Sequence, residues 1–134
     1  MAKRKETSTN SENRNYFATC DLTYAVCLIG GRWKLLILCK LENGKLRFGE
    51  LRDQICNITE RMLTLQLREL ERDGMVKRTV YAEVPPRVEY ELTEISQRLV
   101  PIWEQLSKWG GKHKETMSQK SVVEAEEEKL TEIV

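Results

Sequence analysis

Apolar and polar residues alternate with a helical period most clearly between Thr59 and Arg72. Leu63, Leu67 and Leu70 are spaced at i, i+4 and i+7, so a helix would bury them along one stripe. At about 100° per residue, the opposite face carries the residues Arg61, Thr64, Leu65, Arg68 and Arg72. Guanidinium groups on such a face suit phosphate oxygens and a guanine edge, although exposed Arg and Glu residues are also ordinary on a solvated helix.

Two more apolar segments precede this one. We expect a first helix that Asp21 or Thr23 caps and that Gly30-Gly31 ends. The densest apolar run, Trp33–Leu41, has a length that fits either a buried strand or a buried helix. Because leucine and lysine outnumber β-branched residues in this run, we predict a helix.

The residues that follow predict a helix–turn–helix. Lys45–Phe48 fits one short strand, and apolar spacing predicts a third helix at Phe48–Ile55, which Cys56-Asn57 breaks. Thr59 stands where the N-cap of a fourth helix belongs, and Gly74 stands at its C′ position.

Two β-rich runs come next, Val76–Tyr81 and Arg87–Leu92. In the second run, apolar and charged residues alternate, which predicts one buried and one solvated face. The connecting residues, Ala82–Pro86, include two prolines that cannot donate hydrogen bonds to a ladder, so we expect a stiff loop at the tip of a hairpin. A last long helix should begin at Thr93, kink or split at Pro101, and end at Gly110-Gly111.

This order of elements predicts the fold class: mainly α with a small antiparallel β-hairpin (α+β), arranged as a winged helix-turn-helix. A chain of 134 residues is long enough for one domain with tails. We expect a mobile polar arm at 1–15, the winged domain with its dimerisation helices at 16–112, and a charged tail at 113–134 that frays or is disordered, with some helix possible.

The net charge of +1 is uninformative as a total, but the cations are concentrated in the middle of the chain. They are Arg32, Lys34, Lys40, Lys45, Arg47, Arg52, Arg61, Arg68, Arg72, Lys77, Arg78 and Arg87. Much of the acid lies in the C-terminal EAEEEKLTEIV. This distribution is compatible with a polyanionic partner, and a mixed solvated surface would account for it equally well.

Several classes of protein find little support. No apolar run approaches the roughly 20 residues that span a bilayer, and the N-terminus has no apolar signal region, so we expect a cytoplasmic protein. His113 is the single histidine, and no triad, phosphate loop or CxxC pair occurs, which argues against an enzyme, a bound metal or a cofactor. Disulfide stapling is also not expected in this compartment.

Five parts of the sequence resemble the HxlR-type family of bacterial transcriptional regulators, which are relatives of the MarR group. They are Cys20, LIGGRWKLLIL (Leu28–Leu38), RFGELR (Arg47–Arg52), MLTLQLRELERDGMVKRTVY (Met62–Tyr81) and EVPPRVEYELTE (Glu83–Glu94). The resemblance covers about residues 20–112 in order and without an obvious gap. It implies a homodimer that binds inverted repeats near promoters and represses or activates nearby genes. It also places a recognition helix at Thr59–Asp73 and a wing at Tyr81–Arg87.

Candidate contacts with double-stranded DNA follow from the pattern and the resemblance together. They are Thr59, Arg61, Thr64, Leu65, Arg68, Arg72, Arg87, Lys34 and Arg47. We assign base and groove contacts to Arg61, Thr64, Leu65 and Arg68, because the N-terminal half of a recognition helix usually reaches base edges.

The other candidates suit the DNA backbone, each with an alternative. Arg72 fits a phosphate or an acidic neighbour, and Lys34 and Arg47 fit phosphates. Arg87 fits a minor groove or a phosphate, or else a cross-strand pair with Glu83 or Glu89. Thr59 would cap the helix, whose first amides can also donate to a phosphate. For the arginines of the helix, the alternative is ion pairing with neighbouring glutamates.

The dimer surface is expected on apolar residues of the terminal helices. They are Tyr16, Phe17, Leu22, Val26, Trp103, Leu106 and Trp109, and the alternative is packing within one subunit.

Cys20 is the candidate redox sensor. Some members of the family sense electrophiles or oxidants through the cysteine that precedes the first helix. The family usually has proline after it, whereas this chain has Asp21, whose charge should disfavour the thiolate. A passive thiol is the alternative. We expect Cys27 and Cys39 in the core and Cys56 exposed in the turn.

A protein-binding winged helix without DNA affinity is the competing function. It would need a reading face without arginine, unlike the face that Arg61 and Arg68 provide.

Overall fold

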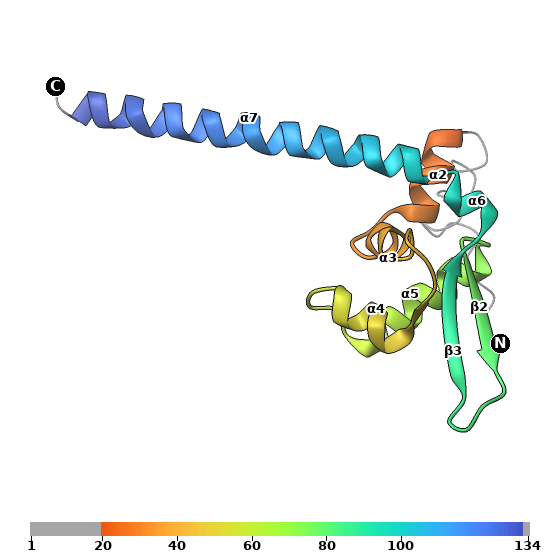
Figure 1. Ribbon diagram of the computed structural model, residues 1–134. Helices are drawn as coiled ribbons and strands as arrows, with labels where there is room; N and C mark the ends of the chain where they lie inside the picture. The colour runs from red at the N-terminus through yellow and green to blue at the C-terminus, as the bar shows by residue number, and fades with distance from the viewer. Residues whose placement is uncertain (1–19, 133–134) are drawn as a thin grey trace, which may run out of the picture. The chain divides into compact units, whose positions relative to one another are not determined.

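The computed structural model describes residues 20–132, and element labels follow Figure 1. The elements are α2 (Asp21–Ile29), α3 (Lys34–Lys40), β1 (Leu46–Arg47), α4 (Phe48–Gln54), α5 (Glu60–Arg72), β2 (Val76–Tyr81), β3 (Arg87–Leu92), α6 (Glu94–Gln97) and α7 (Val100–Glu132). They form two compact units, one ending at Gln97 and one beginning at Arg98. The first unit contains the predicted winged helix-turn-helix, with its hairpin extending beside α5 (Figure 1).

The sheet has three strands, in the order β1-β3-β2, rather than the hairpin alone. β1 pairs with β3 through Leu46↔Tyr90 and Arg47↔Glu89. The short predicted strand therefore joins the hairpin as its third member and fixes the start of α4 against the base of the wing. Both strands of the hairpin have the predicted bounds.

The core of the first unit is built from leucine and isoleucine of three helices. Ile37 and Leu38 come from α3, Leu51 from α4, and Leu63 and Leu70 from α5, and all five are fully buried. The apolar stripe predicted for α5 is thus confirmed. Full burial of one such side chain contributes roughly 1.5–3 kcal/mol, which anchors the helix by its inner face.

Local backbone geometry sets both ends of α5. Asn57, in the turn after α4, has a φ of 67°, a left-handed conformation that asparagine tolerates better than most residues. Gly74 has a φ of 73° just after the helix, as predicted for a C′ glycine. Thr93 then donates its hydroxyl to the Gly74 carbonyl at 2.7 Å, and the buried Ser96 donates to the Met75 carbonyl. These bonds fasten the beginning of α6 to the end of α5.

The N-terminus of the first predicted helix differs in detail. Helix α2 begins at Asp21, so neither Asp21 nor Thr23 is its N-cap. Cys20 occupies that position. Asp21 lies instead in the first turn, where a carboxylate interacts favourably with the helix dipole.

The last helix also differs. The split near Pro101 is confirmed, because α6 ends at Gln97 and α7 begins at Val100. The expected end at Gly110-Gly111 is wrong: α7 continues to Glu132. Neither glycine has a positive φ, and each costs only about 1 kcal/mol relative to alanine, while the surrounding lysine, glutamate and glutamine residues favour a helix. The charged segment expected to fray is helical throughout its described part.

No single helix among residues 20–132 is long and apolar enough to cross a membrane. Only α2 and α3 taken together pass such a test, and they are bent by 70°.

Candidate nucleic-acid interface

The polar face of α5 is presented to solvent because its leucines are buried inside its own unit. Arg61 and Arg68 are exposed, and Leu65 lies between them with 48% of its surface exposed. Within residues 20–132, neither arginine makes an ion pair. The predicted base-contacting face is therefore open and carries two uncompensated guanidinium groups.

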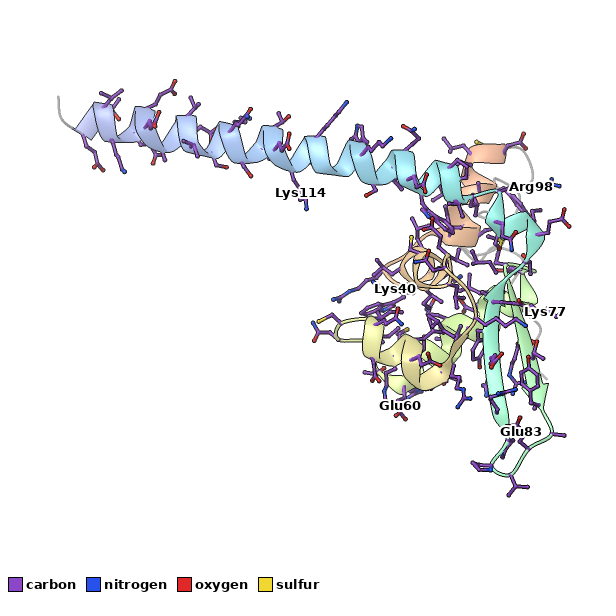
Figure 2. The ribbon with its side chains drawn as sticks, viewed as in Figure 1. Lys40, Glu60, Lys77, Glu83, Arg98 and Lys114 are labelled. Atoms are coloured by element: carbon purple, nitrogen blue, oxygen red, sulfur yellow. The ribbon has the colours of Figure 1, made fainter. Side chains whose placement is uncertain are left out.

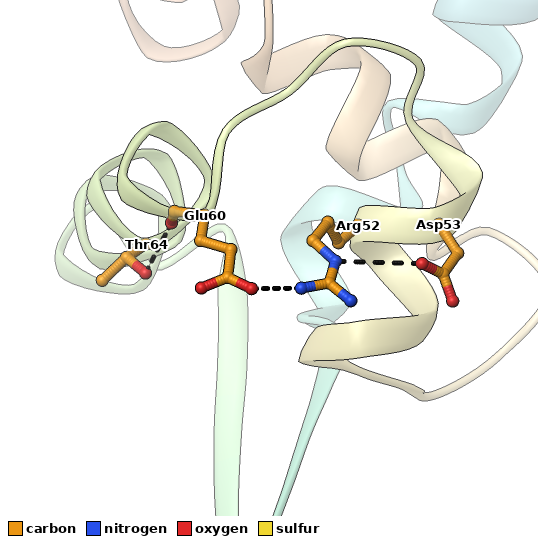
Figure 3. Close-up of polar contacts among 4 residues, drawn as sticks. All are labelled: Arg52, Asp53, Glu60 and Thr64. Atoms are coloured by element: carbon orange, nitrogen blue, oxygen red, sulfur yellow. Dashed lines mark hydrogen bonds and ion pairs between the residues drawn. The ribbon is translucent and has the colours of Figure 1, made fainter.

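The first turn of α5 is ordered by its own side chains. Thr59 is the N-cap, as predicted, and its hydroxyl oxygen accepts a hydrogen bond from the Met62 amide at 3.1 Å. Thr64 donates its hydroxyl to the Glu60 carbonyl at 2.8 Å (Figure 3). Its lone pairs remain able to accept, so Thr64 could accept a hydrogen bond from a base amine, although its own hydroxyl proton is already donated to Glu60.

An ion pair across the helix–helix turn was not predicted. Arg52 of α4 donates to the Glu60 carboxylate at the beginning of α5, and its Nε also lies 3.8 Å from the Asp53 carboxylate (Figure 3). The bridge joins the two helices and compensates the charge of Glu60, the residue before Arg61. Opposite charges eight residues apart across the turn were the available signal, but only the fold brings them together.

Lys34 and Arg72, two predicted phosphate contacts, each lie near a carboxylate of the fold. Lys34 lies 2.9 Å from the Glu69 carboxylate, and its side chain is only 14% exposed. This ion pair joins α3 to α5, so the structure gives Lys34 a scaffold position instead of an open phosphate contact. Arg72 is exposed, with its Nε 3.8 Å from the Asp73 carboxylate, which matches the acidic-neighbour alternative.

The wing arginine is held within the hairpin. Arg87 lies 3.4 Å from the carboxylates of both Glu83 and Glu89, and its guanidinium stacks over the Tyr81 ring at 4.1 Å. Its Nε is buried without a hydrogen-bond partner among the described residues. The cross-strand alternative accordingly describes Arg87 best. Glu83 lies at the tip of the hairpin, where Figure 2 labels it.

Arg47 is exposed at the N-cap of α4, where its amide donates to the Glu50 carboxylate at 3.2 Å. Arg47 and Arg87 line a shared hollow of about 460 Å³ between the beginning of α4 and the wing loop. The fold thus brings together two candidates that lie 40 positions apart in the sequence.

Sequence reasoning missed one cation close to α5. Arg78 of β2 is exposed and lines an open hollow of about 300 Å³, here named the α5–hairpin hollow. Its lining residues are Thr64, Leu67, Arg68, Glu71, Arg78 and Tyr90. The alternation along β2 was the available signal, since Arg78 interrupts the face that Val76 begins.

The cysteines occupy different environments. Hydrogen bonds from the Thr23 hydroxyl and then the Thr23 amide lower the pKa of the Cys20 thiol, with burial opposing them. The sequence had predicted the opposite influence from Asp21. Burial raises the pKa of Cys39, and the nearby charge of Glu42 adds to that effect. Cys56 is exposed as predicted, whereas Cys27 is exposed and not in the core.

The predicted dimer residues include both exposed and buried side chains. Leu22 and Val26 on α2 and Leu106 and Trp109 on α7 are exposed, Trp109 by 64%. Trp103 is only 6% exposed, so it is covered within one chain and is removed from the proposed dimer surface. Tyr16 and Phe17 lie outside the described residues. No cluster suited to a metal ion occurs in residues 20–132.

Comparison with known proteins adds to this geometry. The model of the HxlR-like helix-turn-helix family matches residues 28–118. A helix-turn-helix transcriptional regulator of Methanothermobacter thermautotrophicus is 51% identical over 105 residues, which cover 76% of this chain and 80% of that protein.

Solved structures of regulators are also similar to this chain. The redox regulator HypR in its oxidized form has a TM-score of 0.65 and 51% identity, covering 69% of this chain and 96% of that one. The reduced form of the transcriptional regulator YodB from Bacillus subtilis has a TM-score of 0.61 and 36% identity, covering 66% of this chain and 87% of that one.

Proposed function

This chain belongs to the HxlR-like helix-turn-helix family of transcriptional regulators, and we propose that it acts as a homodimer that binds an inverted-repeat site in double-stranded DNA. The observation that carries the proposal is the open face of α5. Arg61 and Arg68 project from it without ion pairs among residues 20–132, while Lys34 and Arg87 are paired with carboxylates of the fold. Uncompensated guanidinium groups on an exposed helix are the donors that a DNA groove can use.

In the proposed complex, α5 enters the major groove with its N-terminal half toward the bases. Arg61 and Arg68 can each donate two hydrogen bonds to one guanine, and Leu65 can contact a thymine methyl group. Thr64 can accept from a base amine, because its lone pairs are free to do so. The first amides of α5, beside the Thr59 cap, and the exposed Arg72 suit backbone phosphates.

The wing and the beginning of α4 offer a second region for contact with DNA. Arg47 and the partly exposed Arg87 line one hollow, so a DNA strand lying along the wing could approach both. Because Glu83 and Glu89 already compensate Arg87, we expect a smaller contribution from it than from Arg61 or Arg68.

A dimer would align two copies of α5. Leu22, Val26, Leu106 and Trp109 are apolar and exposed in a single chain, and a second copy would remove them from water. Twofold symmetry would place the two reading helices about 34 Å apart, one turn of the duplex, which accounts for an inverted repeat.

Cys20 is the proposed sensor of oxidants or electrophiles. Its lowered pKa increases the fraction of reactive thiolate, and it stands at the beginning of a helix assigned to the dimer surface. Modification there would change how two copies pack and hence the spacing of their reading helices. Support comes from the similarity to HypR and YodB, the first of which is described as a redox regulator.

The test is a selection from random duplex DNA with the purified full chain, followed by titration of the selected site at fixed salt. We expect an inverted repeat, and we expect Arg68→Ala to weaken binding at least tenfold, because a bidentate arginine–guanine contact is worth about 1–3 kcal/mol. Arg32→Ala is the matched control, since Arg32 stacks on Trp33 outside α5 and the wing and its loss should change affinity little.

Circular dichroism of each variant verifies folding. If the wild-type chain enriches no sequence, the function fails and a protein-binding role is favoured. If it enriches a site that Arg68→Ala binds equally well, Arg68 is not a contact.

A further inference from the structure

The two faces of the hairpin differ in whether their positive charges have carboxylate partners. Residues directly opposite in an antiparallel pair project from the same face. Arg78 is paired with Tyr90, and Lys77 with Glu91. These two neighbouring cations therefore lie on different faces of one strand, and each has a different partner.

The face that carries Lys77 is electrostatically compensated. Lys77 and Lys45 both lie 3.9 Å from the Glu91 carboxylate. On the same face, Arg87 is paired with Glu83 and Glu89. These cations, two from the hairpin and one from the loop before β1, therefore already have carboxylate partners on the hairpin.

The face that carries Arg78 is directed toward α5. Its cross-strand neighbour Tyr90 is buried, and both residues line the α5–hairpin hollow with Arg68 and Thr64. Glu71 is the single carboxylate among the lining residues, so two guanidinium groups face one acid there. Within residues 20–132, Arg78 makes no ion pair. The hollow therefore carries a net positive charge and stays open to solvent.

We infer that Arg78 is a further DNA contact, which binds a backbone phosphate at the edge of the groove that α5 enters. The inference rests on the proposed function. A guanidinium matches phosphate oxygens in a bidentate manner, and the pairing of β2 with β3 holds the backbone of Arg78 in place. Because Arg78 comes from the sheet and Arg68 from the helix, a phosphate held between them would fix the depth of α5 in the groove. Such a contact positions the helix without reading sequence.

The test compares two single variants of adjacent residues, Arg78→Ala and Lys77→Ala, on the selected DNA site over a range of salt concentrations. Each removes one positive charge from β2, so long-range attraction falls equally. Only Arg78→Ala should lose a phosphate contact. We expect it to weaken binding about tenfold on specific and unrelated DNA alike, and to reduce the slope of log K against log[salt] by about 1 for each subunit. Lys77→Ala should leave the slope unchanged.

Arg78→Gln serves as a second neutral variant that keeps the first two methylenes and a polar end, and thermal melting verifies that each variant folds. Equal behaviour of the Arg78 and Lys77 variants would overturn this inference and leave the proposed function intact, provided that Arg68→Ala loses specific binding. A loss confined to the selected sequence would also overturn it, because it would indicate base reading. If the wild-type chain binds no DNA, both proposals fail.

Discussion

Helix α5 uses its apolar residues in the opposite way from α2 and α7. In α5, Leu63, Leu67 and Leu70 are buried within the chain, and the polar face is exposed. Helix α2 has no buried residue, and α7 has one in 33 residues. The exposed apolar side chains of α2 and α7 contact water unless another molecule covers them.

This difference separates two roles. A helix whose stripe is buried in its own unit has a fixed orientation, so its outer side chains can be held ready for a rigid ligand such as duplex DNA. A helix whose apolar side chains stay exposed gains stability by association. We therefore expect mutations in α5 to act on folding or on DNA affinity, and mutations in α2 and α7 to act on assembly.

The largest expected effect is on folding. Leu63→Ala should lower the free energy of unfolding by about 2–5 kcal/mol, because Leu63 is fully buried and truncation leaves a cavity. Leu65→Ala, two positions away on the exposed face, should change it by less than about 0.5 kcal/mol. Chemical denaturation followed by circular dichroism measures both. Similar losses in the two variants would mean that α5 is not oriented by its leucine stripe.

A smaller effect is expected on assembly. The double variant Leu106→Lys with Trp109→Lys should raise the dimer dissociation constant at least tenfold, or about 1.4 kcal/mol, because two exposed apolar side chains of α7 are replaced by charges. Sedimentation at micromolar concentration measures it, and Gln105→Lys on the same helix is the control for added charge. A double variant that remains dimeric would remove this part of α7 from the dimer surface.

The smallest effect concerns the thiol at the beginning of α2. The rate of alkylation of Cys20 should reach half its maximum at a lower pH than that of Cys39, since hydrogen bonds from Thr23 lower the pKa of Cys20 and burial raises that of Cys39. Mass spectrometry of the modified peptides measures both rates. Thr23→Val should raise the midpoint of Cys20 alone.

The same shifts fix the sign of any effect on stability. The folded-state pKa of Cys20 is lowered, so ionisation of this thiol stabilises the folded state above the unfolded-state pKa. This stabilisation is lost as pH falls through the folded-state value. For Cys39 the pKa is raised, so the stabilisation by its neutral thiol is lost as pH rises through the folded-state value.

If DNA binding by Cys20→Ser still responds to an electrophile, the sensor lies elsewhere.

The spacing of apolar residues along the chain was sufficient to predict the helices and strands of the first unit. The leucine spacing in α5, the Thr59 cap and Gly74 are local features, and each has a local physical cause in side-chain period, capping or backbone conformation. The end of α7 was mispredicted from Gly110-Gly111, because glycine only weakens a helix and does not by itself end one.

The sequence by itself determined that α5 would be amphipathic, with arginines opposite its leucines, because a helical period assigns residues to faces without reference to the rest of the chain. Only the tertiary structure decided which cations are compensated. Lys34 pairs with Glu69, Arg52 with Glu60, and Arg87 with two glutamates. Arg78, in contrast, lines the open hollow beside Arg68. Charge compensation depends on distances between elements, and those distances are set by packing and strand register, which no single segment encodes.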